Sequence, residues 1–153
     1  MALTFHTGDL DSADVQALLD FHFKQMCETS PPDACHVLPA DGLRDPSVTF
    51  WSARESGELL GVGALKQLAP GHGEIKSMRT APAALGRGIG RALLNHIVAE
   101  ARSCGYTRLS LETGSTQPFA AALRLYASEG FLPCSPFGDY QETPFTRFFT
   151  REL

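Results

Sequence analysis

Gly86, Gly88 and Gly90 stand where a predicted strand gives way to a predicted helix, and Arg87 and Arg91 alternate with them. The first amide groups of a helix have no partner inside the helix and carry a partial positive charge. Glycines at such a point let the backbone approach a ligand closely and adopt positive φ angles. With two guanidinium groups beside it, this turn is predicted to bind an anion such as phosphate.

Two well-known phosphate motifs do not fit this turn. A P-loop needs lysine followed by serine or threonine, whereas arginine or isoleucine follows each glycine here. The dinucleotide fingerprint needs a third glycine, but Arg91 holds that place counting from Gly86, and Leu93 holds it counting from Gly88. A plain strand–helix connection would gain nothing from three glycines, which cost backbone entropy. We therefore interpret the turn as a binding site for a phosphate group.

The elements that position the turn are predicted from hydrophobic periodicity, which indicates a mixed α/β domain with a central sheet. A first helix is expected to be capped by Asp9 or Asp11 and to end at Ser30, before two prolines. Residues 36–45 are ambiguous, and a short helix is one interpretation of them. Strands are expected over 3–6, 47–53, 59–68, 74–80, 107–113, 131–135 and 145–151, with further helices over 91–103 and 118–129.

Length, composition and charge narrow the class of protein. The 153 residues suit a single domain spanning 1–153, and the net charge of −4 argues against a dedicated nucleic-acid binder. No apolar run is long enough to span a membrane, and the N-terminal residues lack the pattern of a signal peptide. We therefore expect a cytoplasmic protein whose four cysteines, at 27, 35, 104 and 134, are reduced and mostly buried.

Two segments carry a resemblance to a known family. The segment from Met78 to Leu94 resembles the central motif of the GNAT superfamily of acetyl-CoA-dependent N-acetyltransferases, and the segment from Ala122 to Phe131 resembles its A-x-x-L-Y-x-x-x-G-F motif. The order of elements is similar to that of compact bacterial single-domain members. The resemblance implies an α/β (α+β) fold with a mixed, mostly antiparallel central sheet of six to seven strands and helices on both faces.

The resemblance also implies how acetyl-CoA is held, without a metal ion. The pantetheine arm is expected to lie along the backbone of Met78, Arg79 and Thr80, and one of those amides to polarise the thioester. Two residues depart from the family pattern: Leu85 replaces a glutamine or arginine, and Phe119 replaces an asparagine and implies a different wall around the pantetheine. The pyrophosphate is expected on the backbone of Leu85, Gly86, Arg87, Gly88, Ile89, Gly90 and Arg91.

The expected chemistry is direct acetyl transfer to an amine in a ternary complex. Tyr126 occupies the family's general-acid position, with a purely structural core tyrosine as the alternative. An ammonium must lose a proton before it attacks, and Glu74 and Glu112 are the two candidate bases. For each of them a solvated carboxylate at a strand end is the alternative, and a chain of water molecules could replace both.

Other residues have weaker signals. The spacing of His22, Cys27, Cys35 and His36 matches no common zinc pattern.

A small-molecule amine is the expected acceptor, and the resemblance suggests a homodimer. A non-catalytic acyl-CoA-binding module and another nucleotide-phosphate binder remain as alternative functions. Core packing and a place in the acceptor pocket are equally compatible with His22, Phe23, Met26, Trp51, Tyr140 and Phe145.

Overall fold

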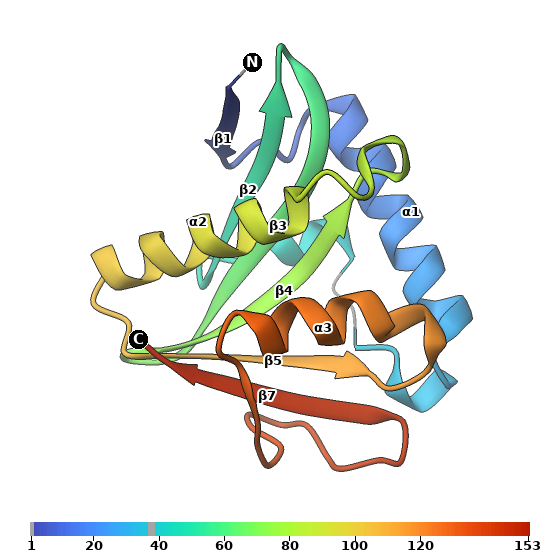
Figure 1. The fold of residues 1–153 in the computed structure, drawn as a ribbon, viewed down its shortest axis with the longest axis vertical. Coiled ribbons are helices and arrows are strands. Elements are labelled where there is room, and N and C mark those ends of the chain that lie inside the picture. Colours follow the sequence, from blue (N-terminus) through green and yellow to red (C-terminus); the bar gives the residue numbers. More distant parts are fainter. Residues whose placement is uncertain (1, 37–38) are drawn as a thin grey trace.

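A computed structural model describes residues 2–36 and 39–153 of the chain, which fold around one seven-stranded sheet (Figure 1). The strand order is β1-β2-β3-β4-β5-β7-β6, and all neighbours except β4 and β5 are antiparallel. The predicted mixed, mostly antiparallel sheet is therefore confirmed. The strands are β1 (Leu3–Thr7), β2 (Val48–Glu55), β3 (Glu58–Ala69), β4 (His72–Thr80), β5 (Arg108–Gly114), β6 (Leu132–Pro133) and β7 (Thr146–Glu152), and the helices are α1 (Ala13–Thr29), α2 (Ile89–Ser103) and α3 (Ala120–Ser128).

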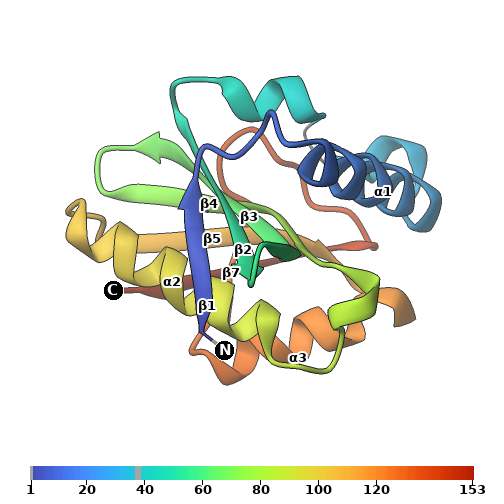
Figure 2. The same cartoon turned by 90° about the horizontal axis from the view of Figure 1, so that it is seen from above.

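The helices cover both faces of the sheet, as expected: α1 lies on one side, and α2 and α3 lie on the other (Figure 2). The two longer helices, α1 and α2, each bury an apolar stripe at helical spacing, whereas α3 buries Tyr126. In α2 this stripe includes Leu93, Leu94, Ile97 and Ala101, the apolar face predicted from the sequence. The ambiguous stretch 36–45 contains a short 3₁₀ helix, Ala40–Arg44, while its residues 37 and 38 lie outside the described residues.

Strands β4 and β5 diverge along their length (Figure 1). Their parallel pairing runs from His72 opposite Arg108 to Glu74 opposite Ser110. Farther along β4 the register with β3 shifts, so that Ser77 and Met78 both lie opposite Gly63. Such a bulge bends a strand and interrupts its ladder of hydrogen bonds. The two central strands thus open a gap in the middle of the sheet.

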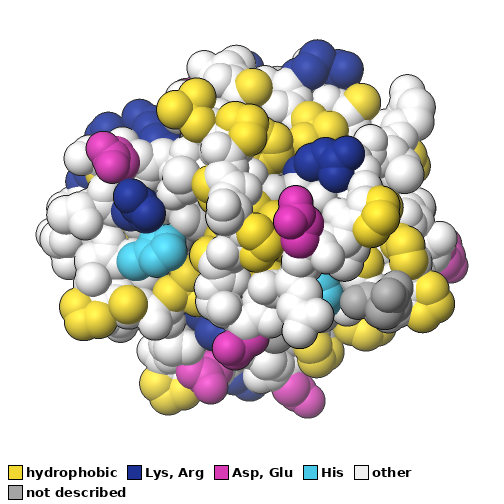
Figure 3. All heavy atoms as spheres, turned by 90° about the horizontal axis from the view of Figure 1, so that it is seen from below, with side chains coloured by type: hydrophobic (Ala, Val, Ile, Leu, Met, Phe, Trp, Pro, Cys, Tyr) yellow, Lys and Arg dark blue, Asp and Glu magenta, His cyan; other side chains and the backbone are white. Residues whose placement is uncertain are grey.

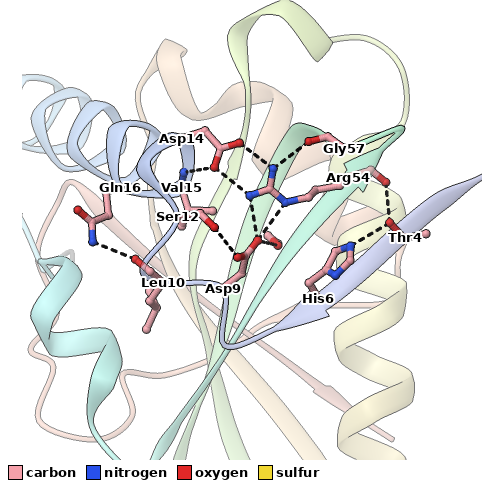
Figure 4. A network of polar contacts seen from close by, with 11 residues as sticks. Thr4, His6, Asp9, Leu10, Ser12, Asp14, Val15, Gln16, Arg54 and Gly57 are labelled. Atoms are coloured by element: carbon pink, nitrogen blue, oxygen red, sulfur yellow. Dashed lines mark hydrogen bonds and ion pairs between the residues drawn. The ribbon is translucent and has the colours of Figure 1, made fainter.

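The start of α1 is joined to β2 by an ionic network (Figure 4). Arg54 of β2 contacts Asp14 at 2.7 Å and Asp9 at 2.9 Å. The prediction that Asp9 or Asp11 caps the helix is wrong, because the N-cap residue is Ser12 and its side chain makes no capping hydrogen bond. Asp9 instead accepts hydrogen bonds from Ser12 and Arg54, and also from Ser52 of β2.

The cysteines differ from the expectation. Cys27, in the last turns of α1, and Cys35, after the 3₁₀ turn Pro32–Ala34, form a disulfide. The prolines that end α1 turn the chain back, which brings the two Cα atoms to 5.3 Å, within the range that a disulfide requires. The thiol of Cys104 is exposed and that of Cys134 is half-buried, so the prediction of four reduced, mostly buried thiols is wrong.

The surface of the protein carries hydrophobic and charged side chains side by side. Seen from below, hydrophobic, basic and acidic groups are interspersed over the visible face (Figure 3). Within the described parts of the chain, no helix combines the length and apolar character needed to cross a membrane.

Candidate active site

A cavity of about 350 Å³ lies where β4 and β5 separate. The second half of α1, both diverging strands, the start of α2 and the helix α3 contribute its walls. It therefore brings together elements from most of the length of the chain. Nine predicted site residues line it: Glu74, Met78, Arg79, Thr80, Leu85, Gly90, Glu112, Phe119 and Tyr126.

The two sides of this cavity differ in chemistry because side chains alternate along a strand. Ile75 of β4 and Leu111 of β5 pack with Tyr126 of α3 in one apolar cluster. Their neighbours in sequence, Glu74, Lys76 and Glu112, point to the opposite face of the sheet, where α1 lies. The cavity thus has an apolar side toward α3 and a side rich in ionisable groups toward α1.

The predicted pyrophosphate turn has an open, uncapped helix start. Gly86 and Gly88 have φ angles of +78° and +79°, the left-handed region that favours glycine. Gly88 is the N-cap of α2 and provides no side chain to satisfy the first amide groups, and a Cβ atom added at either glycine would meet nothing within 4 Å. The geometry therefore leaves backbone donors facing open space, which fits a phosphate group.

The two arginines of the turn already have carboxylate partners. Arg87 pairs with Glu55 of β2 at 3.2 Å, and Arg91 pairs with Glu129 just after α3. The binding potential of this turn therefore comes mainly from its backbone. Leu85, which replaces the usual family residue, is 68% exposed at the edge of the cavity.

The bulge in β4 supplies a feature that the sequence did not predict. Ser77 has a φ of +56°, a conformation that serine rarely adopts. Its buried Oγ has no hydrogen-bond partner among the described residues, and Ser77 lines the cavity. Polar atoms in native interiors are nearly always paired. An unpaired buried hydroxyl at an interrupted strand indicates a place where a ligand would bind.

Tyr126 serves both the core and the cavity. It is 7% exposed, its ring packs edge-on against Phe131 at 5.8 Å, and it lines the cavity. Burial raises the pKa of its hydroxyl to about 12. The phenol therefore keeps its proton throughout the neutral range.

Glu74 is buried rather than solvated. The Tyr140 hydroxyl donates to Glu74 Oε2 at 2.6 Å, and Lys76 Nζ lies 3.2 Å from the same oxygen. Lys76 Nζ also donates to the Tyr140 hydroxyl at 2.8 Å. Burial, together with the neighbouring Glu74 carboxylate, raises the pKa of Tyr140 above its ordinary range. This carboxylate is thus already held by two donors, and the alternative of a solvated strand-end residue is wrong for it.

Glu112 has a different partner on the same side of the cavity. Its Oε2 lies 3.1 Å from Nδ1 of His36, a residue in the segment after α1. Burial raises the pKa of Glu112, and the nearby His36 opposes that shift. The side chains of Glu112 and His36 are 13% and 26% exposed, so solvent reaches this pair only in part.

Arg79 reaches across to α1. Its Nε donates to Nδ1 of His22 at 2.9 Å, and its guanidinium lies over the ring of Phe21 at 5.5 Å. Burial lowers the pKa of His22 to about 3, helped by the charge of Arg79. His22 is consequently neutral near pH 7.

The remaining candidates divide between the core and the cavity. His22, Met26 and Phe145 line the cavity, whereas Trp51 is buried in the apolar cluster beneath α2. Phe23 is 38% exposed and does not line the cavity. Within residues 2–36 and 39–153, no group of three or more histidine, cysteine or acidic residues is arranged to hold a metal ion.

Sequence and structure comparisons agree with this geometry. The model of the Acetyltransferase (GNAT) family matches residues 14–131. The chain belongs to this family of acetyltransferases. It is 49% identical over 145 residues to the uncharacterized N-acetyltransferase YsnE of Bacillus subtilis, covering 95% of this chain and 96% of the relative.

Two solved structures extend the comparison. A protein from Klebsiella pneumoniae described as an acyl-CoA N-acyltransferase superposes with a TM-score of 0.79 at 30% identity, covering 99% of this chain and 97% of the other. A GNAT acetyltransferase from Elizabethkingia anophelis was solved with acetyl-CoA bound. It has the same fold, with a TM-score of 0.70 at 19% identity over 99% of this chain and 98% of the other.

Proposed function

We propose that this N-acetyltransferase moves the acetyl group of acetyl-CoA to the amine of a small-molecule acceptor, directly within a ternary complex. The observation that carries the proposal is a single cavity that contains the bulged edge of β4 and opens beside an uncapped glycine turn. A family member with the same fold has acetyl-CoA bound, which supports the choice of donor.

The donor side of the cavity has backbone groups suited to acetyl-CoA. The amides from Leu85 to Arg91 would hold the pyrophosphate, and the stretch of β4 from Ser77 to Thr80, which lies beyond the part of β4 paired with β5, would hold the pantetheine. Phe119, 6% exposed, forms an apolar wall of the cavity in place of the family's asparagine. When bound, acetyl-CoA supplies an activated acyl group with a thiolate as its leaving group.

Tyr126 is the proposed general acid. As the amine nitrogen bonds to the acetyl carbon, the carbon–sulfur bond breaks and the departing thiolate needs a proton. Tyr126 lines the cavity and its hydroxyl is protonated at neutral pH, so it can donate that proton. The nitrogen is positively charged once it has bonded to the acetyl carbon, and the proton that it then loses restores the phenol. Its ring is fixed by packing against Phe131, which holds the hydroxyl in one place.

The Glu112–His36 pair is the proposed general base. A carboxylate accepts the proton on Nδ1 of His36, which leaves Nε2 with a lone pair that can take a proton from the acceptor's ammonium group before the neutral amine attacks. Glu74 is less available for this step, because it already accepts hydrogen bonds from Tyr140 and Lys76. We therefore assign Glu74 to positioning and Glu112 to proton transfer.

The test is release of free CoA thiol over a broad panel of amines, with calorimetric titration of acetyl-CoA in parallel. Micromolar binding together with turnover on at least one amine supports the proposal. Tight binding without turnover on any amine would favour a non-catalytic acyl-CoA-binding module. Competition by ATP or NAD at the same site would instead favour another nucleotide-phosphate binder.

A further inference from the structure

Two cationic side chains of β4 line the cavity, and only one of them has an acidic partner. Lys76 is paired with the buried carboxylate of Glu74 at 3.2 Å. Arg79 is half-buried, and among the side chains that the structure describes no carboxylate lies within 4.0 Å of it. Buried or half-buried charges in proteins are normally neutralised by a counter-charge. Arg79 is therefore a half-buried cation with no acidic partner among the described residues, at a position that faces a ligand cavity.

The contacts of Arg79 orient it without neutralising it. Its Nε donates to Nδ1 of His22, so that nitrogen must be unprotonated and the imidazole proton must sit on Nε2. The ring of Phe21 covers the guanidinium. Within the described residues, this is the one hydrogen bond that Arg79 makes through its side chain, and its two Nη groups remain available. Two parallel N–H groups of this kind match the two oxygens of a carboxylate.

The anion that fits this position belongs to the acceptor rather than to acetyl-CoA. The pyrophosphate turn lies at the start of α2, on the face of the sheet that α2 and α3 cover (Figure 2). The side chain of Arg79 runs to His22 of α1, on the other face. The same α1 side of the cavity holds Glu112 and His36, the pair assigned to the attacking amine.

We propose that Arg79, with the Nε2–H of His22 as a second donor, binds a carboxylate of the acceptor, so that the acceptor is an amine that also carries a carboxylate, such as an amino acid. This inference rests on the proposed function. The charges of the cavity then match the acceptor at both ends, since Arg79 faces its carboxylate and Glu112 faces its ammonium group.

The test compares amino acids with their primary amides, which keep the amine and remove the negative charge. We expect the wild-type protein to have a kcat/KM about 10- to 100-fold higher for the best amino acid than for its amide, as hydrogen bonds to a charged group would give. In Arg79→Gln this preference should vanish through a higher KM for the amino acid, while the Kd of acetyl-CoA stays unchanged. Arg79→Lys should retain part of the preference.

Arg124→Gln is the matched control, because it removes an exposed positive charge from α3 outside the cavity. It should leave the preference unchanged. Turnover with no preference in the wild-type protein, or a preference that survives in folded Arg79→Gln, would overturn the inference while leaving the acetyltransferase proposal intact. If Arg79→Gln does not fold, the wild-type comparison and Arg79→Lys decide the question. Absence of turnover on every amine would count against the proposed function itself.

Discussion

Glu112 and His36 are 76 positions apart in the chain, yet Glu112 Oε2 lies 3.1 Å from His36 Nδ1, and both residues line the cavity where β4 and β5 separate. The carboxylate comes from a rigid strand, and the histidine comes from the segment that follows α1. Their contact fixes which imidazole nitrogen carries the proton. It is the arrangement on which the proposed proton transfer depends.

The first prediction concerns this pair. Glu112→Gln and His36→Gln should each lower kcat by about 10²- to 10⁴-fold, the usual range for loss of a general base, and the double variant should lose little more. The pH dependence of kcat/KM, measured by thiol release, should lose its acidic limb in both variants. Glu74→Gln provides the comparison, and it should change stability more than the shape of the pH profile. An unchanged acidic limb in Glu112→Gln would remove Glu112 from the mechanism.

The raised pKa of Glu112 also leads to a prediction about the stability of the protein. Because burial raises its pKa, the folded state binds a proton more readily than the unfolded state does. The contribution of Glu112 to the free energy of unfolding is thus favourable at acid pH, and it is lost as the pH rises through the pKa of Glu112 in the folded state. At pH 7 the buried negative charge of Glu112 lowers the stability of the folded state. Glu112→Gln should therefore unfold at the same temperature as the wild-type protein or at a higher one. Thermal scans at pH 4 and pH 7 can check this.

The second prediction concerns Tyr126. Tyr126→Phe should lower kcat by about 10²-fold or more and leave the Kd of acetyl-CoA within a few-fold, because the ring keeps its packing and only the acid is lost. Tyr106→Phe alters a half-buried tyrosine outside the cavity and should keep full turnover. Since the pKa of Tyr126 is about 12, turnover should not decline between pH 8 and 10 through ionisation of this residue. Full activity of Tyr126→Phe would exclude it as the acid.

The third prediction concerns the glycine turn. Gly88→Ala and Gly105→Ala both place a side chain at a left-handed position with open space around it, at opposite ends of α2. Each should cost roughly 1–2 kcal/mol of stability because of the backbone conformation. Only Gly88→Ala should weaken acetyl-CoA binding, by about tenfold or more in calorimetry, because its Cβ would enter the space in front of the helix amides. Equal affinities in the two variants would place the pyrophosphate elsewhere.

The parts of the site that could be predicted are those encoded locally. Alternating glycines before an amphipathic helix specify an open helix start, whatever the rest of the chain does. Alternation along β4 and β5 likewise places Glu74 and Glu112 on the same face of the sheet as Lys76. The partners His36 and Tyr140 lie in irregular segments, whose positions depend on how α1 and the last loop pack. No periodicity in the sequence reports that packing.

The predictions that were wrong also depended on how separate segments of the chain pack together. A sequence separation of eight between Cys27 and Cys35 does not reveal that the prolines after α1 turn the chain back. Aspartate is a good N-cap residue, which is why the sequence predicts Asp9 or Asp11 as the cap. Asp9 lies instead beside Arg54 of β2, 45 positions away in the chain. The ion pair with Arg54 outweighs the preference of aspartate for the N-cap.

The fourth prediction tests that ion pair. Arg54→Met should destabilise the protein by about 1–3 kcal/mol at pH 7, between the values typical of exposed and buried pairs, because the half-buried Asp9 loses its counter-charge. The pKa of Asp14 is lowered by hydrogen bonds from Arg54. Burial alone would raise the pKa of Asp9. Hydrogen bonds from Ser12, Ser52 and Arg54 outweigh burial, so the pKa of Asp9 is lowered as well.

With lowered folded pKa values, the unfolded state binds protons first as the pH falls. The contribution of the network is therefore complete well above the ordinary aspartate pKa of 3.8 and is lost as the pH falls through the lower folded values. The stability difference between the wild-type protein and Arg54→Met in urea should consequently shrink from pH 7 to pH 3. Arg44→Met is the control, because its pair with Asp11 is largely exposed and should contribute less than about 1 kcal/mol at either pH. A difference that stays constant with pH would mean that Arg54 stabilises the fold through packing of its side chain alone.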